Sequence, residues 1–131
     1  MTNNYSEELI KQAKQASNNA YAPYSSFKVG AALLAANGKV YVGCNVENAT
    51  YGATICAERA AVAMAIADGQ REFTALALYT KTPKPLTPCG ICRQVLCEFS
   101  PQMKIIAACE NNQIQISTLQ DLLPDAFTLN K

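Results

Sequence analysis

Three cysteines and one glutamate of this sequence lie at spacings that suit metal chemistry. Cys89 and Cys92 form a C-x2-C pair directly after Pro88, and Cys56 lies two residues before Glu58. A C-x2-C pair at the start of a helix presents both sulfurs to one ion. Three thiolates fill three of the four tetrahedral positions of Zn2+, and a fourth position left to water is typical of a catalytic site. The sequence therefore predicts one zinc ion per subunit, held by Cys56, Cys89 and Cys92.

Glu58 is predicted to be the catalytic residue of this site. At two residues from Cys56 it is near enough to reach a water at the open position without binding the metal itself. A carboxylate placed there accepts a proton from that water and returns it to the substrate. The chain contains no histidine, which excludes nucleophiles that depend on a Ser–His or Cys–His pair. The predicted nucleophile is therefore an activated water.

Other interpretations of the cysteines stay open at this point. A C-x2-C pair could be a redox pair, but that interpretation leaves Cys56 and Glu58 unexplained. A purely structural zinc site needs a fourth ligand, and Cys44 on an expected strand is the main candidate. Cys97 and Cys109 lie among apolar residues, which is typical of small core side chains.

Alternating strands and helices are expected to position these residues. An Asn37-Gly38 pair predicts a hairpin between the first two strands, and Ser6 is expected to cap the first helix. The pattern predicts a single α/β domain over residues 1–131, with a largely parallel sheet covered on both faces and antiparallel hairpins added. In chain order we expect helix Ser6–Asn19, strands Phe27–Ala35 and Lys39–Val46, helix Cys56–Asp68, strand Phe73–Thr80, helix Gly90–Phe99, strands Lys104–Cys109 and Gln113–Ser117, and a last helical turn Thr118–Leu123.

The expected helix over residues 57–67 is apolar on every side after Glu58 and Arg59. A helix of this kind is buried all round. Its outer side is expected to pack against another subunit, although a central helix sandwiched inside one subunit would explain the pattern too.

The overall composition bounds the partners. The net charge is +1 and the basic residues are scattered, so no nucleic-acid or membrane-surface partner is expected. No apolar run is long enough to cross a membrane, and no export signal is visible, so a cytoplasmic location is expected. Cysteines in that compartment are free thiols or metal ligands rather than disulfides.

The chain resembles the cytidine deaminase family in its small, homotetrameric, three-cysteine form. The likeness covers nearly the whole sequence. It rests on Tyr21-Ala-Pro-Tyr-Ser-Ser-Phe27 with the following strand, Gly43-Cys-Asn-Val-Glu-Asn-Ala49, Cys56-Ala-Glu-Arg59, Pro88-Cys-Gly-Ile-Cys-Arg-Gln94 and Leu122-Leu-Pro-Asp-Ala-Phe127. The resemblance implies a three-layer α/β/α fold with a five-stranded mixed sheet. It also implies zinc-dependent conversion of cytidine and 2′-deoxycytidine to uridine and 2′-deoxyuridine with release of ammonia, in pyrimidine salvage.

The same resemblance implies how the nucleoside is bound. Phe27 would stack on the pyrimidine, since an aromatic face is a good platform for a base; taken alone, it could equally be a core residue. Asn45 and Glu47 would hydrogen-bond the ribose hydroxyls. Backbone groups of Ala57 and Cys89 would touch the edge of the pyrimidine.

Further residues are assigned by likeness only. Ala49 would help to complete the pocket, Tyr51 would reach a neighbouring subunit's site, and Phe127 would close over the base across an interface. Arg59 would donate hydrogen bonds to the ligand sulfurs and draw off part of the excess negative charge of three thiolates on one Zn2+.

Three rival functions remain at the level of sequence. One is a deaminase of a modified cytosine nucleoside of the blasticidin type. A polynucleotide editor would need a basic groove and aromatic platforms, which the near-neutral charge does not favour. The third is a zinc-stabilised interaction module without catalytic activity, which requires a fully coordinated ion.

Overall fold

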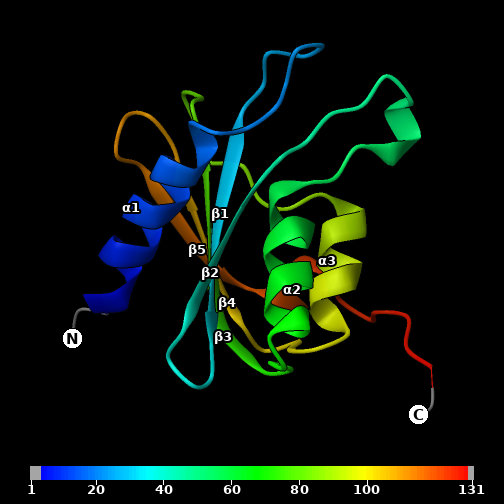
Figure 1. The fold of residues 1–131 in the computed structure, drawn as a ribbon. Coiled ribbons are helices and arrows are strands. Elements are labelled where there is room, and N and C mark those ends of the chain that lie inside the picture. Colours follow the sequence, from blue (N-terminus) through cyan, green and yellow to red (C-terminus); the bar gives the residue numbers. More distant parts are fainter. Residues whose placement is uncertain (1–3, 130–131) are drawn as a thin grey trace.

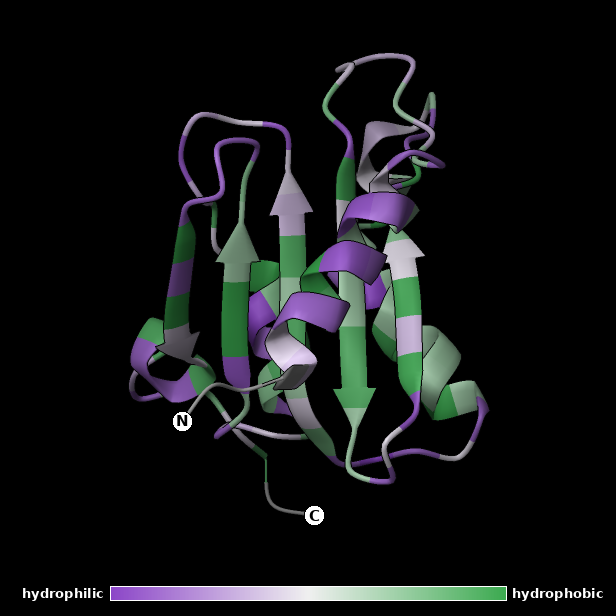
Figure 2. Ribbon diagram, turned by 90° about the vertical axis from the view of Figure 1, so that its left-hand side faces the viewer, coloured by the Kyte–Doolittle hydropathy of each residue, from purple (hydrophilic) through white to green (hydrophobic). Residues whose placement is uncertain are grey.

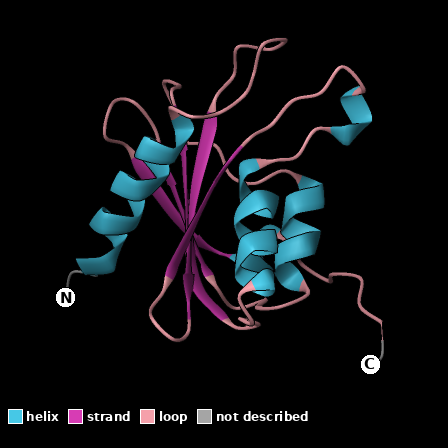
Figure 3. Cartoon of the chain, viewed as in Figure 1, coloured by secondary structure: helices cyan, strands magenta, loops and turns pink. Residues whose placement is uncertain are grey.

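The computed structural model of the chain describes residues 4–129. One mixed sheet forms the middle layer, with α1 on one face and α2 and α3 on the other (Figures 1 and 3). The elements are α1 (Asn4–Ser17), β1 (Val29–Ala35), β2 (Val40–Cys44), the 3-10 turn η1 (Tyr51–Ala53), α2 (Ala57–Ala67), β3 (Phe73–Thr80), α3 (Gly90–Cys97), β4 (Lys104–Ala108), β5 (Ile114–Thr118) and α4 (Leu119–Leu122). The predicted α/β/α layers and their element order are confirmed.

The sheet has the strand order β2-β1-β3-β4-β5. Only β3 and β4 pair in parallel, while β1–β2, β1–β3 and β4–β5 are antiparallel. The five-stranded mixed sheet implied by the family resemblance is therefore right, and the largely parallel sheet inferred from the alternation of elements is wrong. The reason is that the crossover through α2 does make β3 parallel to β2, but β1 lies between them and opposes both.

Two apolar cores lie on the two faces of this sheet. Leu9 and Ala13 of α1 pack on Ala32, Ala75 and Ile106 on one face. The outward side of α1 is hydrophilic, as Figure 2 shows. The second core, under α2 and α3, is built from alternate residues of the same strands, including Leu33, Leu76, Leu78 and Ile105 with Ala57, Ala61, Val62 and Leu96. Because successive side chains of a strand point to opposite faces of the sheet, the same strands contribute residues to both cores.

Two glycines let the helices approach the sheet closely. A Cβ at Gly43 would lie 2.4 Å from the Ala57 carbonyl oxygen, at the start of α2. A Cβ at Gly30 would lie 1.8 Å from the Ala13 carbonyl oxygen of α1. Because neither position has room for a side chain, Gly43 sets how near the first turn of α2, with its chemistry-bearing residues, lies to the strands.

One local expectation is wrong, and one alternative that was left open is excluded. α1 begins at Asn4, so Ser6 lies inside the helix and is not its cap; its hydroxyl is buried without a partner among the described residues. α2 is not sandwiched inside the subunit, because the side chains of Ala63, Met64 and Ala67 on its outer side are exposed, Met64 by 56%. In the part of the chain that the structure describes, no helix is long and apolar enough to cross a membrane.

Candidate metal centre and adjoining pocket

Three cysteine sulfurs meet where the first turns of α2 and α3 come together. The Sγ atoms of Cys56, Cys89 and Cys92 all lie within 4.8 Å of one another. Within residues 4–129, no further cysteine and no carboxylate joins this group. A Zn–S bond of 2.3 Å places tetrahedral ligand sulfurs about 3.8 Å apart, so a cluster of this size suits Zn2+. Cys44, the candidate fourth ligand, is not a member, which removes the main support for a purely structural site.

Each helix start contributes one of the clustered cysteines. Cys56 is the N-cap of α2 and Cys89 the N-cap of α3, each in extended backbone conformation. Their carbonyls accept the first helical bonds, from Ala60 N at 3.0 Å and from Arg93 N at 2.9 Å. The partial positive charge at each helix start favours thiolate ligands.

The thiols differ in their electrostatic surroundings. Burial raises the pKa of the Cys92 thiol, and the charges of Glu58 and Cys56 raise it further. Burial also acts on Cys89, but hydrogen bonds from the backbone and side chain of Cys92 outweigh it, and the pKa of Cys89 is lowered. A divalent cation among the sulfurs would supply the positive charge that this group of acids lacks.

Glu58 faces the same place from the first turn of α2. Its side chain is buried, with 5% exposure, and it lines a pocket together with Cys56 and Cys89. Burial raises the pKa of its carboxyl group, against smaller opposing effects of its own backbone, of Arg59 and of Cys92. A carboxyl group held in such surroundings is a candidate proton carrier.

Arg59 lies beside the sulfurs, where the family resemblance put it. Its Nη2 donates to Cys56 Sγ at 3.7 Å and to the Thr54 carbonyl at 3.3 Å. The hydrogen bond to Cys56 raises the pKa of the guanidinium. Its Nε is buried and has no partner among the described residues. Arg59 is therefore a partner of the Cys56 sulfur rather than a surface arginine.

The pocket beside the sulfurs has a volume of about 300 Å3, at the lower end of the range for small-molecule sites. Its walls come from the ends of the strands, the loop before β1, the start of α2 and the loop before α3. The lining residues are Ser25, Phe27, Val29, Asn45, Glu47, Thr54, Cys56, Ala57, Glu58, Leu78, Thr80, Leu86, Thr87 and Cys89. Phe27 is 41% exposed, so it serves this pocket rather than the core.

The side chains of Asn45 and Glu47, which are predicted to bind the ribose, are held in place by hydrogen bonds to neighbouring residues. Asn45 accepts from Val29 N at 2.8 Å and donates to the Phe27 carbonyl at 2.7 Å. Glu47 Oε1 accepts from Tyr24 N at 3.0 Å and Ser25 N at 3.1 Å, and its other oxygen accepts from the Ser25 hydroxyl. The Ser25 hydroxyl lowers the pKa of Glu47, although partial desolvation opposes this. Glu47 is thus a fixed carboxylate acceptor at the mouth of the pocket.

The remaining predicted residues lie outside the pocket of their own subunit. Tyr51 lines an adjoining hollow of about 320 Å3 together with Glu47 and Thr54, and its ring meets Tyr24 edge to face. Ala49 lines neither space. Phe127 is 68% exposed, and its carbonyl accepts a hydrogen bond from Gln94 Nε2 of α3 at 2.9 Å.

Three residues near the site were not singled out from the sequence. Ser25 orients Glu47 and accepts a hydrogen bond from Phe27 N at 3.0 Å. Thr87 lines the pocket, and Arg93 binds the loop in front of Cys89. Ser25 and Arg93 lie within the motifs that carry the family resemblance, but only the folded chain shows what their side chains contact.

Most of the chain is similar to known proteins. Residues 3–109 match the family described as the cytidine and deoxycytidylate deaminase zinc-binding region. A cytidine deaminase of Sporosarcina psychrophila is 48% identical over 123 residues, which cover 93% of this chain and 90% of that protein. A blasticidin-S deaminase of Bacillus cereus is less similar, at 24% identity over 110 residues and 78% of each chain.

The fold is similar to that of solved structures. The crystal structure of a cytidine deaminase from Burkholderia pseudomallei superimposes with a TM-score of 0.90 at 48% identity. The superposition covers 97% of this chain and all of the other one. Sequence and fold therefore point to the same group of proteins over nearly the entire length of the chain.

Proposed function

The chain belongs to the cytidine and deoxycytidylate deaminase family, and on that premise we propose that it deaminates cytidine and 2′-deoxycytidine hydrolytically. The products are uridine or 2′-deoxyuridine and ammonia. One observation carries this proposal: three thiols that fit one Zn2+ and a buried carboxyl group, that of Glu58, gather at the same pocket.

Cys56, Cys89 and Cys92 would hold the zinc ion. When bound, Zn2+ supplies a Lewis acid that brings the pKa of a coordinated water towards neutrality. Glu58 accepts a proton from the attacking water and passes it to N3 of the pyrimidine. The water oxygen bonds to C4, and Glu58 then takes the second proton from that oxygen and delivers it to the amino nitrogen. The bond from C4 to nitrogen breaks, ammonia leaves, and a C4=O double bond forms.

The other lining residues orient the nucleoside. Phe27 offers an aromatic face at the pocket mouth, against which a pyrimidine stacks. Asn45 keeps one free N–H besides the bonds that it makes to Phe27 and Val29. With the fixed carboxylate of Glu47, it offers a donor and an acceptor for the 3′-hydroxyl, while backbone groups of Ala57 and Cys89 line the base edge.

The subunits would assemble into a homotetramer through the α2 and α3 side of the molecule. Met64 is 56% and Ile91 64% exposed there, and Tyr51 and Phe127 are exposed on neighbouring segments. Apolar side chains gathered on one side favour association. Because Tyr51 and Phe127 lie outside the pocket of their own subunit, we assign them to neighbouring sites. Light scattering of the purified protein should give the mass of four chains, and Met64→Lys should reduce it.

The reaction belongs to pyrimidine salvage, because it turns a cytosine nucleoside into a uracil nucleoside. All six cysteines are free, and thiolate ligands persist in a reducing compartment. We therefore place the enzyme in the cytoplasm, where fractionation of cells expressing the chain would find it.

A spectrophotometric assay tests the activity. The loss of cytosine-nucleoside absorbance is followed with cytidine, 2′-deoxycytidine and blasticidin S, before and after a zinc chelator. We expect turnover of both plain nucleosides, its loss on chelation and its return with added Zn2+. A metal-free preparation that remains fully active, or turnover of blasticidin S alone, would overturn the proposal.

A further inference from the structure

The side chain of Arg93 makes three hydrogen bonds to other segments of the chain. It directly follows the metal-ligand candidate Cys92 in α3, and all three of its guanidinium nitrogens donate. Nε binds the Pro88 carbonyl at 2.7 Å, Nη2 binds Thr87 Oγ1 at 2.8 Å and Nη1 binds the Leu122 carbonyl at 2.6 Å. Hydrogen bonds from a charged donor are stronger than neutral ones, so these three contacts hold their partner residues firmly.

Two of these bonds fix the loop that presents Cys89. Residues 81–89 contain no helix or strand, and Pro88 has no N–H with which to tie down its own peptide. The side chain of Cys89 makes no capping bond at the start of α3. Arg93 makes a further bond to this turn, because its backbone N binds the Cys89 carbonyl at 2.9 Å. The guanidinium therefore holds the two residues that precede Cys89.

The third bond reaches the far end of the chain. Leu122 is the last residue of α4, a helix of four residues, and Arg93 satisfies its carbonyl. The next residue of α3, Gln94, holds the Phe127 carbonyl at 2.9 Å. Successive side chains of α3 thus hold the segment 119–127 against the helix that carries Cys92.

We propose that Arg93 is a positioning residue of the metal centre, which fixes the Cys89 ligand through the Thr87–Pro88 backbone and fastens the C-terminal segment 119–127 to that centre. This inference rests on the proposed function only in that Zn2+ binds the three thiols. It predicts that metal binding and the order of the C-terminal segment depend on each other through one guanidinium group.

The first test is the rate at which the zinc-loaded protein releases its metal to a colorimetric chelator. Loss of residues that orient metal ligands typically weakens metal binding 10–100-fold, so we expect Arg93→Met to release zinc about 10–100-fold faster. Arg93→Lys, which keeps the charge and one hydrogen bond, should fall between. Thr87→Val removes a single acceptor and should show a smaller change in the same direction, which keeps the test decisive if Arg93→Met does not fold.

Two controls separate positioning from general loss of stability. Arg71 is an exposed arginine whose guanidinium binds the Ile66 and Gln70 carbonyls, so Arg71→Met should release zinc as the unchanged chain does. Leu9 is buried in the α1 core on the other face of the sheet, so Leu9→Ala should lower the Tm without speeding zinc release below the transition. Equal acceleration in Leu9→Ala and Arg93→Met would overturn the inference.

The second test is hydrogen exchange with and without bound zinc. In the unchanged chain, zinc should slow exchange of amides in the segment 119–127, and in Arg93→Met this zinc-dependent protection should vanish. Protection that persists in the variant would refute the link through Arg93 and leave the deaminase proposal intact. An unchanged chain that takes up no zinc at all would refute the metal centre, and with it both proposals.

Discussion

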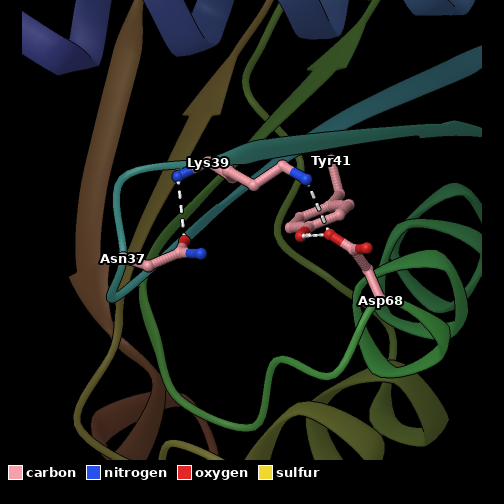
Figure 4. Close-up of polar contacts among 4 residues, drawn as sticks. All are labelled: Asn37, Lys39, Tyr41 and Asp68. Atoms are coloured by element: carbon pink, nitrogen blue, oxygen red, sulfur yellow. Dashed lines mark hydrogen bonds and ion pairs between the residues drawn. The ribbon is translucent and has the colours of Figure 1, made fainter.

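The two ends of α2 gather polar side chains in opposite ways. At its start, Cys56 caps the helix and the buried Glu58 faces the other sulfurs. At its end, the capping residue Asp68 is exposed and binds Lys39 Nζ at 2.7 Å and the Tyr41 hydroxyl (Figure 4). Side-chain exposure is 60% for Lys39 and 46% for Asp68, against 5% exposure for Glu58.

This difference in exposure distinguishes a structural cluster at one end of α2 from a candidate catalytic group at the other. In the Lys39–Tyr41–Asp68 cluster the charges of Lys39 and Asp68 balance each other and are exposed to solvent. Such surface ion pairs add little to stability. Glu58 is buried among acidic thiols, an arrangement that costs free energy unless a cation joins it. Groups of the second kind are found at functional sites, so we propose catalysis at the start of this helix and a structural role at its end.

The largest effect is expected when the proposed proton carrier, the carboxyl group of Glu58, is removed and the shape of its side chain is kept. Glu58→Gln should retain its zinc and lose about four orders of magnitude in kcat, the upper range for general acid–base catalysis, because one carboxyl group serves every proton transfer. Steady-state kinetics and metal analysis of the same preparation measure both quantities. Glu72→Gln, at an exposed position before β3, is the matched control and should leave kcat unchanged. A near-normal kcat in Glu58→Gln would show that another group moves the protons.

A smaller effect is expected from the arginine that joins Glu58 in the first turn. Arg59→Gln should keep zinc bound and lower kcat about 10–100-fold, since the Cys56 sulfur loses its donor and holds more negative charge against the metal. Activity and zinc content decide the outcome, with Arg71→Gln as the control. Full activity would reduce Arg59 to a packing residue, and loss of the metal would make it essential for binding.

Much of this catalytic end could be predicted from the sequence, because its signals are local. Cys56, Glu58 and the Cys89–Cys92 pair lie at fixed spacings at helix starts, so their meeting follows from α2 and α3 lying side by side on one face of the sheet. The strand direction could not be obtained in the same way. Alternation of elements gives the crossovers, but it does not say that β1 lies between β2 and β3.

Contacts between distant segments were also beyond sequence reasoning. Arg93 binds a carbonyl at Leu122, and any residue type offers a carbonyl, so no pattern announces the bond. The hydrogen bonds from Asn45 to the backbone at Phe27 and Val29 are hidden for the same reason. The roles assigned to Ala49, Tyr51 and Phe127 stay predictions, and those of Tyr51 and Phe127 would depend on neighbouring subunits.

The smallest expected effect belongs to the exposed end of α2. Hydrogen bonds from Lys39 and then Tyr41 lower the pKa of Asp68 from its ordinary 3.8, so the stability that Asp68 contributes is present above that value and disappears as the pH falls through the lower folded pKa. The hydrogen bond to Asp68 raises the pKa of Lys39 from 10.5, so that contribution is present below 10.5 and disappears as the pH rises through the higher folded pKa. Asp68→Asn should therefore lower the Tm by a few degrees at most, by a constant amount from about pH 5 to pH 9, and leave kcat unchanged.

Thermal unfolding of the single and double variants across this pH range would sharpen the contrast between the two ends. Lys39→Met should cost a similar small amount, and Asp68→Asn together with Lys39→Met should cost less than the sum of the two, because both remove one ion pair. Since the pair is exposed, added salt should shrink the differences further. A large loss of Tm or of kcat in Asp68→Asn would mean that the exposed end of α2 shapes the catalytic end, and that the two ends do not divide structure from chemistry.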